Sequence, residues 1–139
     1  MYKHILISTD GSDLSLKGVE HGIGLGKENA SEITVVTVCQ PYPLQSAATL
    51  DSWSAAQKKH AHEALTKAKQ IAEKHGADIT TRQETNDSAA EAIVETAEKL
   101  GCDLIVMASH GRRGISRLLL GSQTSEVVSH SPIPVLVVR

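Results

Sequence analysis

The segment most suggestive of chemistry is the glycine-rich stretch from Ala108 to Ser122, which reads ASHGRRGISRLLLGS. Its glycines would let backbone N–H groups approach a ligand closely, and Gly121 would open a helix whose N-terminal dipole favours anions. Two arginines follow Gly111 and could meet phosphate oxygens. The stretch therefore indicates a phosphate site, although the same residues would also suit ordinary turns on a solvated loop.

Strand-like and helix-like segments alternate along the whole chain. Short apolar or β-branched runs are separated by segments that carry apolar residues at helical spacing. Ser12 or Asp13 is a suitable N-cap for the first helix, and Gly76 a suitable C-cap for the second. The predicted strands are His4–Ile7, Ile33–Val38, Asp78–Arg82, Leu104–Met107 and Val135–Val138, and the predicted helices are Leu14–Glu28, Ser52–His75, Ser88–Leu100 and Ser122–Ser129.

This alternation predicts an α/β fold that forms one domain over residues 1–139. Its sheet should be doubly wound and parallel, with five strands and helices on both faces, as in Rossmann-like folds. The polar third strand is expected at an edge. Ligands bind such sheets beyond the carboxyl ends of the strands where the winding direction reverses. We therefore expect the loops that begin at Thr9 and Ala108 to lie together.

Composition and charge argue against several other functions. Lys and Arg number 14 against 16 Asp and Glu, and only 2% of the residues are aromatic, which disfavours nucleic-acid binding. The chain has no apolar run that approaches the roughly 18 residues of a membrane span, and its start lacks a signal-peptide pattern. Cys39 and Cys102 lie far apart and are expected to be buried and reduced. We expect a cytoplasmic protein that binds neither nucleic acid nor membranes.

Several motifs that would indicate an enzyme or a different nucleotide site are incomplete. A Walker A sequence is missing, and the glycines at 22, 24 and 26 lie inside a predicted helix rather than at a strand-to-helix turn. Together with Gly18, they are predicted to let that helix approach the sheet. His110 has no recognisable nucleophile and carboxylate to complete a triad. We therefore expect no enzyme, or at most a weak ATPase.

The chain resembles the universal stress protein family, in its ATP-binding branch. The family pattern G-x2-G-x9-G-[ST] is matched in register by Gly111, nine residues, and then Gly121 and Ser122. The opening KHILISTDGS and the ending PIPVLVV are similar to the family as well, so the resemblance covers the whole chain. It implies a sheet order of 3-2-1-4-5 and a bound ATP, ADP or AMP, accompanied by Mg²⁺ or Mn²⁺.

The resemblance also implies roles for individual residues. The residues implied are Thr9 and Asp10 beside adenine and ribose, Val38 in the adenine pocket, Met107 and Ala108 against the ribose, and Gly111, Arg112, Arg113, Gly114, Gly121, Ser122, Gln123 and Thr124 around the phosphates. One residue departs from the family pattern, because Ala108 stands where the motif has its first glycine. The departure matters if that position requires positive φ or a very close contact.

Three functions remain open from the sequence. The first is a nucleotide-dependent regulatory protein of the stress response that signals through an unidentified protein partner. The second is a nucleotide-independent interaction module of the same fold, for which Ala108 is the reason. The third is an ATP-dependent ligase or hydrolase, which would carry a motif such as SGGxDS where this chain has STDGSD.

The last strand is expected to drive self-association. Val135–Val138 is entirely apolar and would form an edge of the sheet in the implied strand order. An uncovered apolar edge strand tends to pair with another chain. The resemblance likewise implies a homodimer that is joined by antiparallel pairing of the two last strands.

Overall fold

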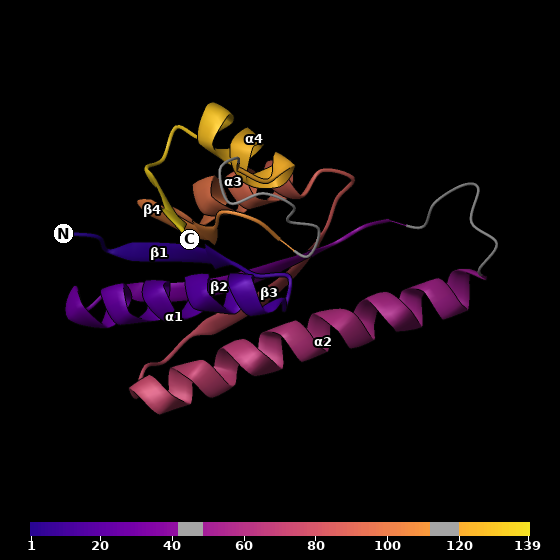
Figure 1. Cartoon of the computed structure of the whole chain (residues 1–139), viewed down its shortest axis with the longest axis horizontal. Coiled ribbons are helices and arrows are strands. Elements are labelled where there is room, and N and C mark those ends of the chain that lie inside the picture. Colours follow the sequence, from indigo (N-terminus) through magenta and orange to yellow (C-terminus); the bar gives the residue numbers. More distant parts are fainter. Residues whose placement is uncertain (42–48, 112–119) are drawn as a thin grey trace.

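The structure, a computed structural model, describes residues 1–41, 49–111 and 120–139. It contains a parallel sheet of five strands in the order β3-β2-β1-β4-β5, as expected (Figure 1). The strands are β1 (His4–Ser8), β2 (Glu32–Cys39), β3 (Thr80–Thr85), β4 (Leu104–Ala108) and β5 (Val135–Val138), and the helices are α1 (Asp13–Glu28), α2 (Leu50–His75), α3 (Ala89–Leu100) and α4 (Ser122–His130).

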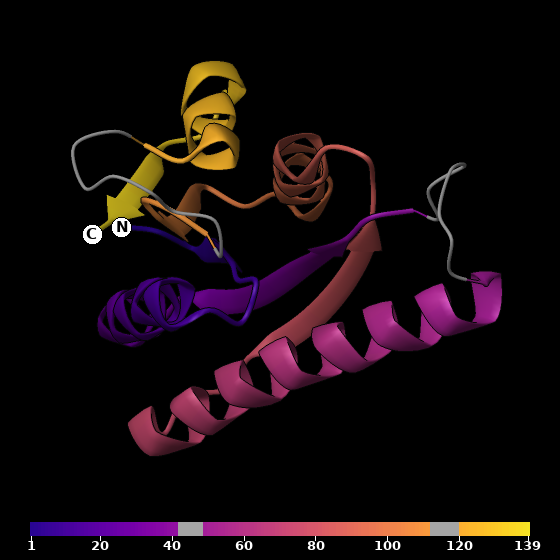
Figure 2. The same cartoon turned by 45° about the vertical axis from the view of Figure 1, so that its right-hand side comes forward.

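The helices form a layer on each face of the sheet. The first two lie on one face, and α3 and α4 lie on the other (Figures 1 and 2). Alternate residues of β1 supply the two cores: Ile5 and Ile7 pack beneath α1 with Ile23, whereas Leu6 packs on the opposite face with Ile93. This alternation follows from the two-residue period of a strand. Both faces of the central strands are therefore apolar and buried.

Three glycines bring α1 close to the sheet, as predicted. A Cβ atom on Gly18 would lie 3.2 Å from the backbone nitrogen of Ala108, and one on Gly26 would lie 2.6 Å from Ile33 Cδ1. A Cβ on Gly22 would lie 2.5 Å from Ile7 Cδ1. Gly24 differs, because no described heavy atom outside its own stretch of helix lies within 4 Å of that position. The close approach therefore depends on the glycines spaced four residues apart.

The predicted boundaries need one notable correction. The third strand runs from Thr80 to Thr85, whereas the sequence predicted Asp78–Arg82. Pairing with β2 decides its extent, because Thr85 lies opposite Cys39 at the end of that strand. This segment is polar and half exposed at the sheet edge, so hydrophobic pattern could not show where it ends. The caps at Ser12 and Gly76 are confirmed.

The two sheet edges differ in character. The strand β3 is polar, whereas β5 is apolar, with Leu136 exposed and Val135 and Val137 half-buried. Within the described residues, no helix is long and apolar enough to cross a membrane.

Candidate functional site

The carboxyl ends of β1 and β4 lie side by side at the centre of the sheet, where Ile7 pairs with Val106. The loop after β1 is held by its own hydrogen bonds. The Gly11 N–H donates to Thr9 Oγ1 at 3.1 Å, and the same hydroxyl lies 2.8 Å from Ser15 Oγ. The side chain of Thr9 is thus buried in the loop and orders it.

Asp10 lies between this loop and Gly111, a residue of the segment that follows β4. Its Oδ1 atom accepts a hydrogen bond from the Ser12 N–H at 2.9 Å, which fixes the carboxylate beside the start of α1. A Cβ atom on Gly111 would lie 2.6 Å from Asp10 Oδ2. A side chain at position 111 would therefore push the carboxylate end of Asp10 aside. Two of the predicted site residues are therefore brought together.

Ala108 occupies an ordinary strand position. It is the last residue of β4 and pairs with Val138. Among the described non-glycine residues only Ala30 has positive φ, so Ala108 does not need glycine's conformational freedom. The Thr124 hydroxyl donates to the carbonyl of Ala108 at 2.8 Å and ties α4 to the end of β4.

Gly121 begins α4 in close contact with the preceding loop. Its N–H donates to the carbonyl of Ser109 at 2.8 Å. A Cβ atom on Gly121 would lie 3.3 Å from both His110 Cα and Ser109 O, which is tighter than an ordinary contact. Glycine thus lets the first turn of α4 lie against the buried residues Ser109 and His110.

The N-terminus of α4 differs from the N-termini of the other helices. Ser12, Thr49 and Ser88 each accept a backbone N–H of their own helix through the side-chain oxygen. Gly121 has no side chain to do so, and Ser122 next to it is exposed. The first N–H groups of α4 are therefore not covered by a side-chain cap, and the helix dipole adds partial positive charge there.

The remaining predicted residues take varied positions. Gln123 Oε1 accepts the N–H of Ala90 at 2.9 Å, so this side chain links α4 to the first turn of α3. Val38 is half-buried near the end of β2, and Met107 is buried in the core beneath α3 and α4. The predicted contacts of Arg112, Arg113 and Gly114 lie outside the described residues.

Two residues near the site were not singled out as binding residues by the sequence. Lys67 on α2 places its Nζ atom 3.4 Å from the carbonyl oxygen of Gly11. Ser109 is buried, and its Oγ lies 3.0 Å from His110 Nδ1. No described carboxylate hydrogen-bonds to His110, so Ser109 and His110 do not form a triad with an orienting acid. Only tertiary packing could reveal the approach of Lys67.

The cysteines are buried, as expected, and are not near-neutral nucleophiles. Burial raises the pKa of the Cys102 thiol to about 11. Burial also raises the pKa of Cys39, although the Gln83 amide that donates to its sulfur acts in the opposite direction. Both thiols therefore remain protonated at neutral pH. In the described ranges, no group of three or more His, Cys, Asp or Glu side chains could hold a metal ion.

Comparison with known proteins identifies the family. The chain matches the universal stress protein family over residues 1–139. It is 41% identical to a universal stress protein of Methanocaldococcus jannaschii, across 100% of this chain and 83% of that protein. The fold is similar to that of a universal stress protein in complex with cAMP, with 29% identity, a TM-score of 0.78, and coverage of 99% and 97% of the two chains.

A second solved structure, the universal stress protein UspA from Lactobacillus plantarum, has 25% identity and a TM-score of 0.86, and covers 99% of this chain and 98% of that one. The family match and the similarity of fold therefore agree over 99% of this chain. The chain belongs to the universal stress protein family.

Proposed function

We propose that this protein binds ATP at the carboxyl ends of β1 and β4 and acts as a nucleotide-dependent regulator in the cytoplasmic stress response. The observation that carries the proposal is the start of α4. Gly121 lies against the loop backbone and leaves the first N–H groups of the helix without a side-chain cap. Backbone N–H groups at a helix N-terminus are well suited to phosphate oxygens.

The surrounding residues fit an adenine nucleotide. Asp10 follows β1 by two residues, and half-buried Val38 lies next to the last residue of the neighbouring strand β2, where the adenine and ribose would lie. Gly111 lies so close to the Asp10 carboxylate that a Cβ atom there would come within 2.6 Å of Oδ2, so glycine leaves this carboxylate in place. Ser122 is exposed and free to add a hydroxyl to the phosphate site. The relative crystallised with cAMP supports an adenine nucleotide as the ligand.

The side chains that are engaged within the fold would act by holding the site in shape. Thr9 orders the loop after β1, and Thr124 and Gln123 fix α4 to β4 and α3. Their backbone atoms remain candidates for direct contact with the nucleotide. A metal ion such as Mg²⁺ or Mn²⁺ would enter with the triphosphate and neutralise its charge, because no described cluster of protein ligands would hold one alone.

Regulation fits the site better than rapid catalysis. His110 contacts the adjacent Ser109, without a described carboxylate to orient it as a general base. Hydrolysis would therefore be slow, and the bound nucleotide would favour one state of the protein for a protein partner. The nucleotide-independent module is the weaker alternative, since Ala108 takes an ordinary strand conformation.

Self-association through β5 is part of the proposal. This strand forms an apolar edge of the sheet, with Leu136 exposed and Val137 half-buried. Antiparallel pairing with the same strand of a second copy would satisfy the edge hydrogen-bonding groups and cover these side chains. A closed two-fold dimer would result.

Calorimetric titration of the nucleotide-free protein with ATP, ADP, AMP and cAMP, with and without Mg²⁺, tests the proposal. We expect saturable binding of ATP with a one-to-one stoichiometry. In separate rate measurements, phosphate release should be much slower than nucleotide exchange. The absence of binding by any of the four nucleotides would contradict the proposal and favour the nucleotide-independent module.

A further inference from the structure

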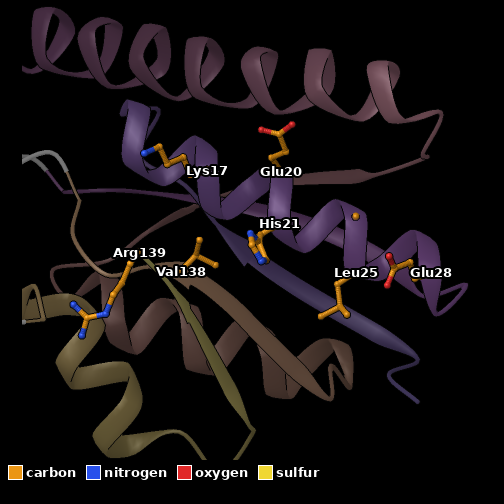
Figure 3. A pocket seen from close by; sticks show the side chains of 8 residues that line it. Lys17, Glu20, His21, Leu25, Glu28, Val138 and Arg139 are labelled. Carbon is orange, nitrogen blue, oxygen red and sulfur yellow. The ribbon is translucent and has the colours of Figure 1, made fainter. Parts of the chain in front are cut away.

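An open groove lies away from the proposed nucleotide site, along the outer side of α1. It has a volume of about 500 Å³, and its wall is formed by α1 while its floor includes Val138 of β5 (Figure 3). The lining residues of α1 include Lys17, His21, Leu25 and Glu28, which recur at helical spacing and form one stripe. Lys17, His21 and Glu28 are exposed, whereas half-buried Leu25 borders the side of the helix that packs on the sheet.

Gly24 lies in the middle of this stripe and has no packing role within the chain. A Cβ atom there would meet no described heavy atom within 4 Å, unlike a Cβ on Gly22. Glycine inside a helix costs about 1 kcal/mol relative to alanine. A glycine at this point is therefore unfavourable for the isolated fold, but it leaves a notch through which another molecule could approach the helix backbone.

The charges on the stripe are separated by the notch. Lys17 lies at one end and Glu28 at the other, eleven residues or about three helical turns away, as Figure 3 shows. Neither residue forms an ion pair within the described part of the chain. Glu20 points instead toward α2 (Figure 3), where its Oε1 lies 3.4 Å from His75 Nε2. The stripe is thus basic at Lys17 and acidic at Glu28, with His21, Gly24 and Leu25 between these ends. Glu20 and Arg139 also line the groove.

Two copies of this stripe are complementary in charge when the two helices run antiparallel. In two antiparallel copies of α1 related by a two-fold axis, Lys17 of each copy would face Glu28 of the other. The same register would place His21 of each copy over Gly24 of the other, where the absence of a side chain gives it room. One antiparallel register therefore both pairs the opposite charges and gives each His21 side chain room over Gly24.

We propose that the groove along α1 is a self-docking surface, which receives α1 of a second copy of this chain in antiparallel orientation. The contact would cover Leu25 and the part of Val138 that lines the groove. It uses the helical face of the molecule rather than the backbone edge of β5. It is therefore a second two-fold contact, independent of the proposed edge-strand dimer and of nucleotide binding.

Analytical ultracentrifugation from micromolar to millimolar concentrations tests this contact in a Val137→Lys background, in which pairing along β5 is blocked. We expect this protein still to self-associate. Lys17→Glu and Glu28→Lys should each raise the dissociation constant about tenfold or more, because two attractive pairs become repulsive in each dimer. An equimolar mixture of these two variants should regain the association, since every facing pair is then attractive.

The matched controls are Lys99→Glu and Glu95→Lys, which make the same charge changes at exposed positions on α3. Neither they nor their mixture should alter self-association. Gly24→Leu should weaken it by filling the notch, while circular dichroism shows an intact helix content. The inference is overturned if the Val137→Lys protein is monomeric throughout, or if the mixture associates no better than its components. Nucleotide titration of the same variants should remain normal in every case.

Discussion

The backbone of Gly111 lies directly against the carboxylate of Asp10, so that a Cβ atom on Gly111 would come within 2.6 Å of Asp10 Oδ2. The other carboxylate oxygen, Oδ1, accepts the N–H of Ser12. The loops that follow β1 and β4 therefore lie in close contact at Asp10 and Gly111, although about one hundred residues separate them in the sequence.

Gly111→Ala should weaken nucleotide binding without unfolding the protein. The new methyl group would displace the Asp10 side chain from its hydrogen bond with Ser12, and so would disturb the adenine and ribose side of the site. We expect the dissociation constant for ATP to rise about tenfold, equivalent to about 1.4 kcal/mol. Calorimetry measures this, with Gly24→Ala as the control because its methyl group would meet open space. Equal affinity in the two variants would exclude the role given to Gly111.

Substitution by alanine should lower the free energy of unfolding at Gly22 but raise it at Gly24. Gly22→Ala places a methyl group 2.5 Å from Ile7 Cδ1, and the overpacking should lower the free energy of unfolding by about 1–2 kcal/mol. Gly24→Ala has no such contact and should raise that free energy by about 0.5–1 kcal/mol through helix propensity. Urea denaturation of both variants provides the measurement. A loss of stability in Gly24→Ala would mean that its surroundings are packed.

Asp103 should contribute to stability at neutral pH but not in strong acid. The N–H groups of Lys3 and His4 donate to its carboxylate and lower the pKa of that carboxyl below its usual value. A lowered pKa in the folded state stabilises the fold above the unfolded pKa of about 3.9, and this contribution is lost as the pH falls through the folded value.

We therefore expect Asp103→Asn to be less stable than the wild type at neutral pH, and the difference to shrink as the pH falls below about 4. Urea titrations at a series of pH values give the comparison. Asp87→Asn is the control, since Asp87 is exposed on a loop. A stability difference that stays constant down to strong acid would show that the charge of Asp103 is not its source.

Val137→Lys should reduce the mass of the protein in dilute solution. A charged side chain on the half-buried edge strand β5 opposes pairing with a second copy, whereas Thr80→Lys on the opposite edge strand β3 should not change the mass. Light scattering distinguishes monomer from dimer at micromolar concentration. If both variants keep the wild-type mass, β5 is not the dimer edge.

The sequence predicted the strand order only through the family resemblance, but the alternation of elements was evident from its own pattern. Buried strands such as Leu104–Ala108 are apolar throughout and could be located well. The end of β3 could not, because its polar residues follow the pairing with β2 rather than a hydrophobic rhythm. Elements with two buried faces are thus more predictable than those at an edge.

The proximity of the two loops was predictable from the sequence, but the contacts around them were not. Parallel strands end at one edge of the sheet, so the loops containing Asp10 and Gly111 were expected to meet. The link from Gln123 to Ala90 and the approach of Lys67 to Gly11 depend on how helices pack, which no local motif encodes. Likewise Gly22 and Gly24 are the same residue type, and only the side of α1 that each occupies separates their roles.

We expect the start of α4 to hold the phosphates of the nucleotide, and the substitution Gly121→Asp tests this placement. Aspartate is a favourable N-cap, so α4 should be retained once Ser109 and His110 shift slightly to admit the new Cβ atom. Its carboxylate would cap the N–H groups and repel phosphate. Ser129→Asp adds the same charge at an exposed position in the last turn of α4 and serves as the control.

Calorimetric titration with ATP and Mg²⁺ compares the wild type, Gly121→Asp and Ser129→Asp, after thermal unfolding has shown that all three are folded. We expect saturable binding by the wild type and by Ser129→Asp, with at least about a tenfold loss of affinity in Gly121→Asp. Undiminished binding by folded Gly121→Asp would contradict this placement, because the phosphates would then lie elsewhere.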